Sequence, residues 1–194
     1  KYMQTAVPDG VGAMAAILGL DNDQVIEVCK AATSSQIVSA ANFNSAGQVV
    51  IAGHREAVEK AAELAKEAGA KRAILLPVSV PSHCELMHEA ADRLAGRMEQ
   101  VQFSEAEIPI IQNVDVIQRT SPDEIKKALL EQLHQPVRWV ETVEKIRSMN
   151  ISTIVECGPG KVLAGLIKRI DRSIEVAPVF DIKSLESALN GAQT

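Results

Sequence analysis

The sequence predicts an α/β protein built from two parts, and three observations lead to this prediction. Short apolar runs, many of them β-branched, alternate with amphipathic stretches along the whole chain. From residue 11 to residue 78 the alternation runs β-α-β-β-α-β, the order of a ferredoxin-like subdomain, which we place at residues 9–78. The remaining residues, 1–8 and 79–194, supply only about three strands, too few for a parallel sheet covered on both faces. We therefore expect an incomplete α/β domain here, or one that another chain completes.

The first part carries a local signal for most of its elements. The acidic run at 21–23 offers N-caps to the helix that follows, and Asn44 to Gly47 predicts a tight turn between two strands. Gly53 is expected to end the second of these strands. Gly69 stands where a helix commonly closes with a residue in the left-handed conformation. The predicted strands cover 11–20, 37–43, 48–52 and 73–78, and the predicted helices cover 23–33 and 54–68.

The second part is predicted to contain fewer strands and more helices. Pro122 after Ser121 suits the first position of a helix, and Pro136 interrupts the helical pattern that follows. Residues 151–157 are rich in β-branched side chains and lead into a glycine-rich turn, after which a further helix begins. The predicted strands cover 108–116, 151–157 and 174–179, and the predicted helices cover 84–98, 122–133 and 137–149, with a further helix that carries Val162 to Ile170. Alternation of strands and helices indicates parallel pairing.

The composition excludes several classes of protein. Only 3% of the 194 residues are aromatic, so aliphatic side chains and alanine must fill the core. The net charge of −5 is spread without blocks, which argues against a nucleic-acid partner. No apolar run approaches the roughly 20 residues that a membrane-spanning helix needs, so no membrane partner is expected. Cys29, Cys84 and Cys157 show neither disulfide nor metal spacing, so we expect a reducing, cytoplasmic location and no metal.

The segment Pro77–Cys84 holds the strongest candidate for chemistry. It places His83 between a strand-like run and the start of a helix, where a rigidly held loop commonly carries a catalytic group. Imidazole ionises near neutral pH, so His83 could act as a general base, although an isolated histidine is more often only a satisfied polar residue. Ser82 is interpreted as a helix cap.

A nucleophile for such a base is missing from the recognisable motifs. No Gly-x-Ser-x-Gly occurs in the chain, and the nearest approach, at 44–47, lacks the first glycine. Cys84 is an alternative nucleophile, but we favour a small buried thiol at this position. Cys84 and His88 lie one helical turn apart, which suits a metal pair, but no third ligand accompanies them. His54 and His134 are expected to be surface residues.

Three further groups of polar residues have both a structural and a functional interpretation. Asn42 and Asn44 suit turn chemistry, but their amides could equally reach a polar ligand. Lys71 and Arg72 form either a solvated strand edge or a cationic patch for a phosphate group. The run Glu-Cys-Gly-Pro-Gly-Lys at 156–161 forms a strand-to-helix turn, where an anion can bind. Its spacing matches no nucleotide-binding motif, so we favour a structural turn.

These segments together resemble the malonyl-CoA:acyl carrier protein transacylases of bacterial type II fatty acid synthesis. The matching motifs run in family order over nearly the whole chain, and several of them are long. They are AVPDG at 6–10 with GAMAAI at 12–17, NFNSAGQVVIAG at 42–53, GAKRA at 69–73, LPVSVPSHC at 76–84, NVD at 113–115, QL at 132–133 with PV at 136–137 and Trp139, and Glu156 with GPGKVL at 158–163.

The resemblance implies an α/β-hydrolase-like large domain into which the ferredoxin-like subdomain is inserted. It also implies ping-pong transfer, in which a serine takes malonyl from malonyl-CoA and passes it to the phosphopantetheine thiol of acyl carrier protein. His83 matches the catalytic histidine, and Gln132 matches the glutamine whose main-chain carbonyl orients that histidine. The implied coenzyme A cleft matches Asn42, Asn44, Lys71 and Arg72. A coenzyme A thioester is implied as substrate, with no permanently bound cofactor.

Three features of the resembled family are missing from this sequence. They are the Gly-His-Ser-x-Gly nucleophile motif, the glutamine-rich oxyanion loop and the arginine that pairs with the malonyl carboxylate. We therefore expect a C-terminal fragment that lacks transacylase activity until the N-terminal part of the protein joins it. The alternatives are a non-catalytic fragment that binds coenzyme A or acyl carrier protein, and an acyltransferase domain of a modular synthase with another acyl specificity. Residues 79–194 alone are expected to be poorly soluble.

Overall fold

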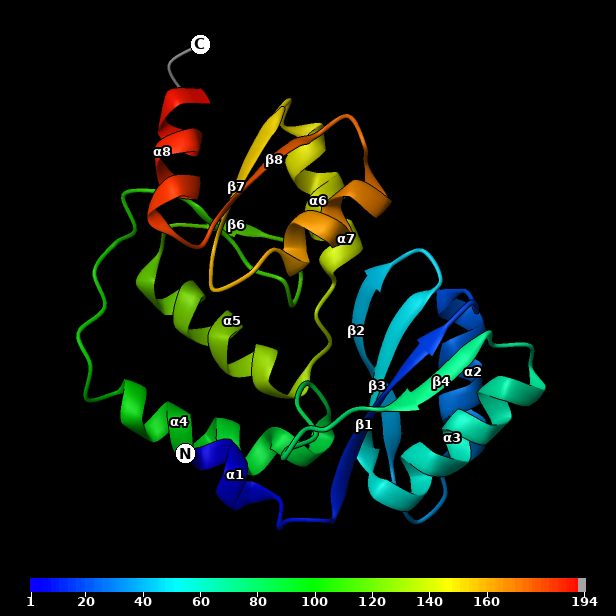
Figure 1. The fold of residues 1–194 in the computed structure, drawn as a ribbon. Coiled ribbons are helices and arrows are strands. Elements are labelled where there is room, and N and C mark those ends of the chain that lie inside the picture. Colours follow the sequence, from blue (N-terminus) through cyan, green and yellow to red (C-terminus); the bar gives the residue numbers. More distant parts are fainter. Residues whose placement is uncertain (192–194) are drawn as a thin grey trace. The chain divides into compact units, whose positions relative to one another are not determined.

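The computed structural model describes residues 1–191, which form two compact units divided between residues 139 and 140 (Figure 1). The first unit contains α1 (Tyr2–Ala6), β1 (Gly12–Leu18), α2 (Asn22–Ala32), β2 (Val38–Ser45), β3 (Gln48–His54), α3 (Arg55–Glu67), β4 (Arg72–Leu75), the 3₁₀ turn η1 (Glu85–Met87), α4 (His88–Met98), β5 (Ile110–Ile111), β6 (Gln118–Arg119) and α5 (Pro122–His134). Helix α6 (Trp139–Ser148) begins at the boundary, and β7 (Thr153–Cys157), α7 (Val162–Ile170), β8 (Glu175–Val179) and α8 (Ile182–Gly191) follow.

A four-stranded antiparallel sheet in the order β2-β3-β1-β4 organises the first unit. Because side chains alternate across a strand, Ala15 and Ile17 of β1 face α2 and α3, while Met14 faces the opposite side with Cys84. Helices α2 and α3 lie together on the first of these faces (Figure 1). The opposite face is the one that receives the loop carrying His83.

The order β1-α2-β2-β3-α3-β4 agrees with the predicted order of elements, and its helix signals are confirmed in detail. Asp21 caps α2 and accepts a hydrogen bond from the backbone of Gln24 at 2.8 Å, while the Gln24 side chain accepts from the backbone of Asp21. Gly69 has φ +99° after α3, and Ala70 N donates to Ala65 O at 2.9 Å, as in a Schellman motif. The subdomain boundary at residue 78 stays a prediction, since the compact units divide at residue 139.

Two predictions about the β2–β3 hairpin are wrong. Asn44 belongs to β2, as Asn42 does, so the turn is confined to Ala46 and Gly47. Gly53 does not end a strand but lies inside β3, opposite Ala13 on one side and Val38 on the other. A Cβ atom at Gly53 would collide with the backbone of Ile37 and Val38, so glycine permits the close approach of β2 here.

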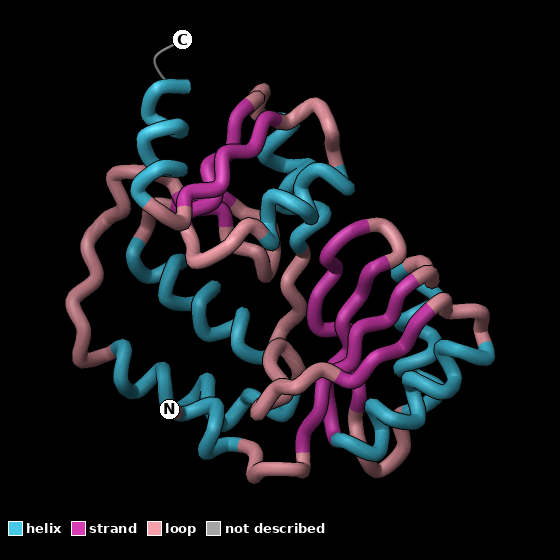
Figure 2. The backbone as a smooth tube through the Cα atoms, viewed as in Figure 1, coloured by secondary structure: helices cyan, strands magenta, loops and turns pink. Residues whose placement is uncertain are grey.

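The strand predicted at 108–116 is reduced to the two residues of β5, which pair with β6. Pro109 lacks a backbone donor, and Val116 takes the left-handed conformation with φ +63°, so regular pairing cannot extend through this segment. Asp115 and Arg119 form an ion pair across the turn, with Nη1 to Oδ1 at 2.8 Å. The long loop that joins α4 to β5 is visible in Figure 2.

The second unit is built on two parallel strands, as the sequence predicts. β7 pairs with β8 in register from Thr153–Glu175 to Cys157–Val179. Helices α7 and α8 both contact β8, and α8 was not anticipated from the sequence, nor was the short α1 in the first unit. Val155 of β7 remains 51% exposed, which is unusual for a parallel sheet and leaves part of its apolar surface uncovered.

None of the helices among residues 1–191 is both long enough and apolar enough to cross a bilayer.

Candidate functional site around His83

The His83 loop is fixed to the sheet before it reaches the histidine. Pro81 is fully buried, and its ring lies against Gly12 at the start of β1, where a Cβ atom would collide with it. His83 itself has φ +64°, a conformation that costs energy in a non-glycine residue and that persists only where surrounding contacts enforce it. Such local strain is found most often at functional sites.

The contacts that enforce this conformation come from the carboxyl end of α5. The last carbonyls of a helix have no partner inside the helix and must be satisfied from elsewhere. His83 satisfies two of them: its backbone N–H donates to Leu133 O at 3.0 Å, and its ring Nδ1 lies 2.6 Å from Gln132 O. Backbone and side chain of the histidine are therefore held by consecutive residues of one helix end.

The contact with Gln132 also determines the tautomer of His83. A carbonyl oxygen can only accept a hydrogen bond, so Nδ1 must carry the proton and donate it. In the neutral imidazole, Nε2 then has a free lone pair and can accept a proton from another group. This is the state that a general base requires.

A cavity of about 520 Å³ opens beside this loop. Its apolar lining includes Val38 and Phe43 of β2 and Pro136, and its polar lining includes His83 and His134. A mainly apolar cleft with a few converging polar groups is the usual form of a small-molecule site. The predicted base therefore borders a cavity large enough for part of a ligand.

Of the two histidines predicted at the surface, neither is a simple surface residue. His134 stacks on His88 with ring centroids 3.8 Å apart, and burial, followed by the charge of His88, lowers the pKa of His134. His54 Nδ1 accepts a hydrogen bond from the backbone of Ile37 at 3.1 Å. Sequence patterns missed both contacts because each joins residues that are far apart in the chain.

Cys84, the alternative nucleophile next to His83, is a buried thiol. Cys84 is 1% exposed, its Sγ donates to Pro81 O at 3.1 Å, and burial raises the pKa of its thiol to about 11. The interpretation of Cys84 as a small buried thiol is thus confirmed. Ser82 is not a helix cap: the N-cap position of η1 is Cys84, and no side chain caps it.

The remaining predicted residues divide between the middle and one end of the sheet. Asn42 lies within the edge strand β2 and forms an isolated parallel bridge with Val137, so the segment after α5 pairs with the edge of the sheet. Lys71 and Arg72 are exposed at the start of β4, beside the end of β1, where Lys71 N donates to Leu18 O at 2.7 Å. Asn44 lies next to the hairpin turn at that same end. His83, in contrast, follows Pro81, which packs at the opposite end of β1.

The first turn of α7, which follows the glycine-rich segment, is capped by a carboxylate of the chain itself. Glu156, 9% exposed, accepts hydrogen bonds from the backbones of Leu163 at 2.9 Å and Ala164 at 2.8 Å. These donors are unpaired groups of the first turn of α7, so the carboxylate fills the position that a bound anion would take. The structural interpretation of residues 156–161 is therefore the better one, and the sequence pattern had missed the role of Glu156.

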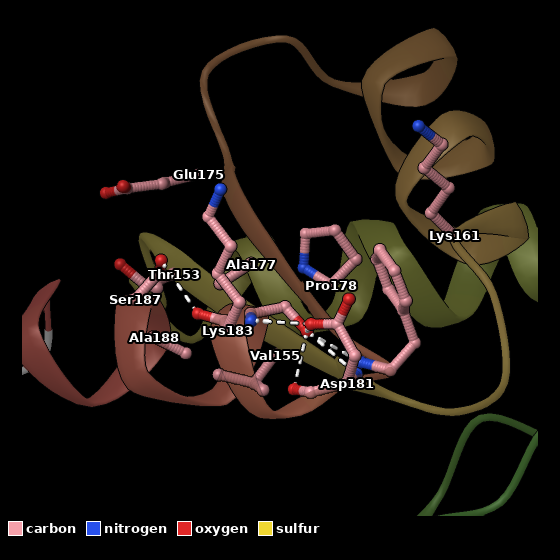
Figure 3. A pocket seen from close by; sticks show the side chains of 12 residues that line it. Thr153, Val155, Lys161, Glu175, Ala177, Pro178, Asp181, Lys183, Ser187 and Ala188 are labelled. Carbon is pink, nitrogen blue, oxygen red and sulfur yellow. Dashed lines mark hydrogen bonds between the residues drawn. The ribbon is translucent and has the colours of Figure 1, made fainter.

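The second unit contains a larger cavity, of about 790 Å³, that lacks comparable chemistry. It lies between the β7–β8 strands and α8, and Figure 3 shows the side chains along it, Val155 and Ala177 from the strands and Lys183 and Ala188 from the helix. The Asp181 carboxylate is already hydrogen-bonded at the start of α8, where its Oδ1 accepts from the backbone N–H of Ser184 at 2.7 Å. We interpret this cavity as an uncovered sheet face.

No group of three or more histidine, cysteine, aspartate or glutamate side chains within residues 1–191 is placed to hold a metal ion.

Comparison with known proteins identifies the family to which the chain belongs. Residues 1–187 match the model of the acyl transferase domain family, and the chain belongs to that family. The relatives are more specific. The chain is 54% identical over 187 residues to a malonyl CoA-acyl carrier protein transacylase of Haemophilus influenzae, covering 96% of the chain and 60% of the relative. A relative of the same name from Escherichia coli K12 is 49% identical, with 97% and 61% covered.

Solved structures agree with this assignment. The chain matches a malonyl-transacylase solved in complex with a type II PKS acyl-carrier protein, with a TM-score of 0.96, 52% identity, and coverage of 98% of this chain and 62% of that chain. An acyl carrier protein S-malonyltransferase from Vibrio cholerae gives a TM-score of 0.94 at 52% identity, with 96% and 61% covered. The chain thus spans about three-fifths of the length of the curated relatives it matches.

Proposed function

We propose that this chain supplies the base-bearing part of a malonyl-CoA:acyl carrier protein S-malonyltransferase of fatty acid biosynthesis. The observation that carries the proposal is the 2.6 Å contact between His83 Nδ1 and Gln132 O, which leaves Nε2 free to accept a proton. The names of relatives that are about half identical over nearly the whole chain support malonyl-CoA and acyl carrier protein as the two reaction partners.

The proposed reaction has two balanced halves. In the first half, His83 Nε2 takes the proton of a serine hydroxyl while the serine oxygen attacks the thioester carbonyl of malonyl-CoA. The tetrahedral intermediate then expels the coenzyme A thiolate, and this thiolate takes the proton from the imidazolium. In the second, His83 takes the proton of the phosphopantetheine thiol, whose sulfur attacks the malonyl-serine ester. The serine oxygen leaves and recovers the proton from His83. Gln132 O accepts the Nδ1 proton throughout.

We further propose that Lys71 and Arg72 bind phosphate groups of coenzyme A. We also propose that the amides of Asn42 and Asn44 hydrogen-bond other polar groups of coenzyme A. Both cations are exposed at one end of the sheet, and their charge suits a phosphate. Neither asparagine side chain makes a hydrogen bond to another residue within 1–191, so their amides remain available to a ligand. The thioester would be a substrate, and no permanently bound cofactor is required.

The serine is proposed to come from an N-terminal part of the same protein. The absence of a Gly-x-Ser-x-Gly motif from the chain supports this, as does its coverage of about 60% of its relatives. In that whole protein, residues 9–78 would form a ferredoxin-like insertion in an α/β-hydrolase-like domain. The exposed face of β7 and β8, with Val155 51% exposed, would pack against the N-terminal part.

The test is complementation in two pieces. The chain is assayed for transfer of labelled malonyl from malonyl-CoA to holo-acyl carrier protein, alone and after co-expression with the N-terminal part of the Haemophilus influenzae relative. We expect no transfer by the chain alone and transfer by the pair. His83→Ala in the pair should lower the rate by at least about 10³-fold, because the base is lost while binding remains.

Two outcomes would contradict the proposal. Transfer by the chain alone at the rate of the pair would place the nucleophile within these residues. An undiminished rate in the His83→Ala pair would remove His83 from the reaction. A pair that carries Gln100→Met serves as the matched control and should keep the full rate, because Gln100 is exposed two residues after α4 and its amide hydrogen-bonds, within residues 1–191, only to the exposed Arg97.

A further inference from the structure

The side chain of Gln132 makes contacts separate from those of its main-chain carbonyl. Its Nε2 lies 3.0 Å from Gln135 O and 3.3 Å from Pro136 O. An amide NH₂ group has two donors, so one side chain can satisfy both carbonyls. These two carbonyls lie just beyond the end of α5, where the backbone has left the helix.

This arrangement replaces the usual way in which a helix ends. Many helices close with a glycine in the left-handed conformation, whose geometry satisfies the last carbonyls through the backbone. After α5 the C-cap residue Gln135 is extended, with φ −113° and ψ 154°, and proline follows it. The backbone therefore turns outward without that device, and the Gln132 amide spans the turn instead.

The segment held by this amide connects two parts of the site. On one side, Gln132 O and Leu133 O hold the ring and backbone of His83. On the other side, Val137 pairs with β2: its N–H donates to Ala41 O at 2.8 Å, and its carbonyl accepts from Phe43 N at 2.9 Å. The turn between these two attachments is only three residues long, so its shape fixes how the carboxyl end of α5 meets β2.

We propose that the Gln132 side-chain amide is a positioning group for His83. By donating to Gln135 O and Pro136 O, it holds the turn that carries its own carbonyl, and so keeps that carbonyl within hydrogen-bonding distance of Nδ1. The importance of this role for catalysis rests on the proposed transacylase function, but the effect on His83 exists in the chain without substrate. A side chain is needed at this position, and not only the carbonyl that every residue possesses.

Nuclear magnetic resonance of the histidine rings tests the proposal on the whole chain. The chain has four histidines, and His83→Gln identifies the signals of His83. Gln132→Met keeps the length and the main-chain carbonyl but removes both donors. We expect the Nδ1 proton of His83 to exchange with solvent roughly tenfold faster or more in this variant, because two hydrogen bonds that hold its acceptor are lost.

Further variants separate donation from packing. Gln132→Lys keeps donors that can reach the same carbonyls, and should recover most of the protection of Nδ1. Gln132→Glu has only acceptors at neutral pH and should behave like Gln132→Met, and it carries the test if the methionine variant does not fold. Gln100→Met, in which an exposed glutamine loses its amide outside the site, should leave the His83 signals unchanged.

An Nδ1 proton as protected in the methionine or glutamate variant as in the unaltered chain would overturn the proposal. Equal loss in the lysine and methionine variants would also overturn it, because packing rather than donation would then be responsible. Since no substrate is used, neither result bears on whether the pair of fragments transfers malonyl. Failure of the transfer assay would likewise leave the measured position of His83 as it is.

Discussion

Replacement of Glu156 by glutamine is the sharpest test of how the second unit is held together. The carboxylate is 9% exposed and accepts two backbone hydrogen bonds, from Leu163 at 2.9 Å and Ala164 at 2.8 Å, in the first turn of α7. Glutamine has almost the same shape but only one acceptor oxygen. Its NH₂ group would have to face one of the two N–H donors, and that donor would lose its partner.

The expected cost follows from these contacts. A hydrogen bond to a charged group contributes about 1.5–3 kcal/mol, and a buried donor left without a partner costs a similar amount. Removal of a negative charge from a helix N-terminus costs about a further 0.3–1 kcal/mol. The two effects together amount to about 2–4 kcal/mol, a large part of the roughly 5–15 kcal/mol that stabilises a typical domain.

Amide hydrogen exchange measures this cost locally, which matters because two compact units need not unfold together. We expect the amides of α7 to exchange about 30- to 1,000-fold faster in Glu156→Gln, equivalent to about 2–4 kcal/mol. Glu175→Gln, an exposed substitution on β8, is the matched control and should leave exchange unchanged. Exchange in α7 within about twofold of the unaltered chain would refute the assignment of Glu156 as the anion that caps α7.

Two further predictions concern charge and thiol chemistry. The Arg119 guanidinium lowers the pKa of Asp115 below its unfolded value of about 3.9, so the pair stabilises the fold above that pH and loses this contribution as pH falls through the lowered pKa. The melting temperature of the unaltered chain should therefore fall more steeply below about pH 4 than that of Arg119→Met; parallel curves would contradict this. Burial raises the thiol pKa to about 11 for Cys84 and about 12 for Cys29, whereas Cys157 is exposed. We therefore expect only Cys157 to react with a thiol reagent at pH 8 in the folded chain. Rapid reaction of more than one thiol before unfolding would contradict this prediction.

Features that depend on neighbouring residues could be predicted from the sequence. The cap at Asp21 and the helix end at Gly69 are local signals, because each involves residues within about one helical turn. Pro122 likewise marks the first turn of α5, where its missing N–H costs nothing. Hydrophobic periodicity and the cap, glycine and proline residues therefore predict most of the helices and strands, although not the residues at which they end.

Features that depend on distant residues could not be predicted from such signals. The partner of His83 is 49 residues away, and no spacing rule connects the two; only the resemblance to a known family indicated Gln132. The sequence predicts a strand end at Gly53, because the close approach of Ile37 that requires glycine there is visible only once β2 and β3 are paired. The turn chemistry expected of Asn44 was likewise overridden by strand pairing in β2.

In the proposed reaction, a helix end at His83 takes the place of the carboxylate found in many triads. A carboxylate next to the imidazole fixes the tautomer and stabilises the imidazolium that forms, but it adds a second group that must be kept ionised. The carbonyl of Gln132 fixes the same tautomer at 2.6 Å without any titration of its own. Because it belongs to the carboxyl end of α5, the partial negative charge of that helix end favours a positive imidazolium nearby, by about 0.3–1 kcal/mol. The same helix end binds the His83 backbone through Leu133 O, so consecutive carbonyls of α5 set the tautomer and hold the backbone at a φ of +64°. The position of the proposed base therefore depends on the shape of the turn after α5, and for this reason we expect the side chain of Gln132 to matter as well as its carbonyl.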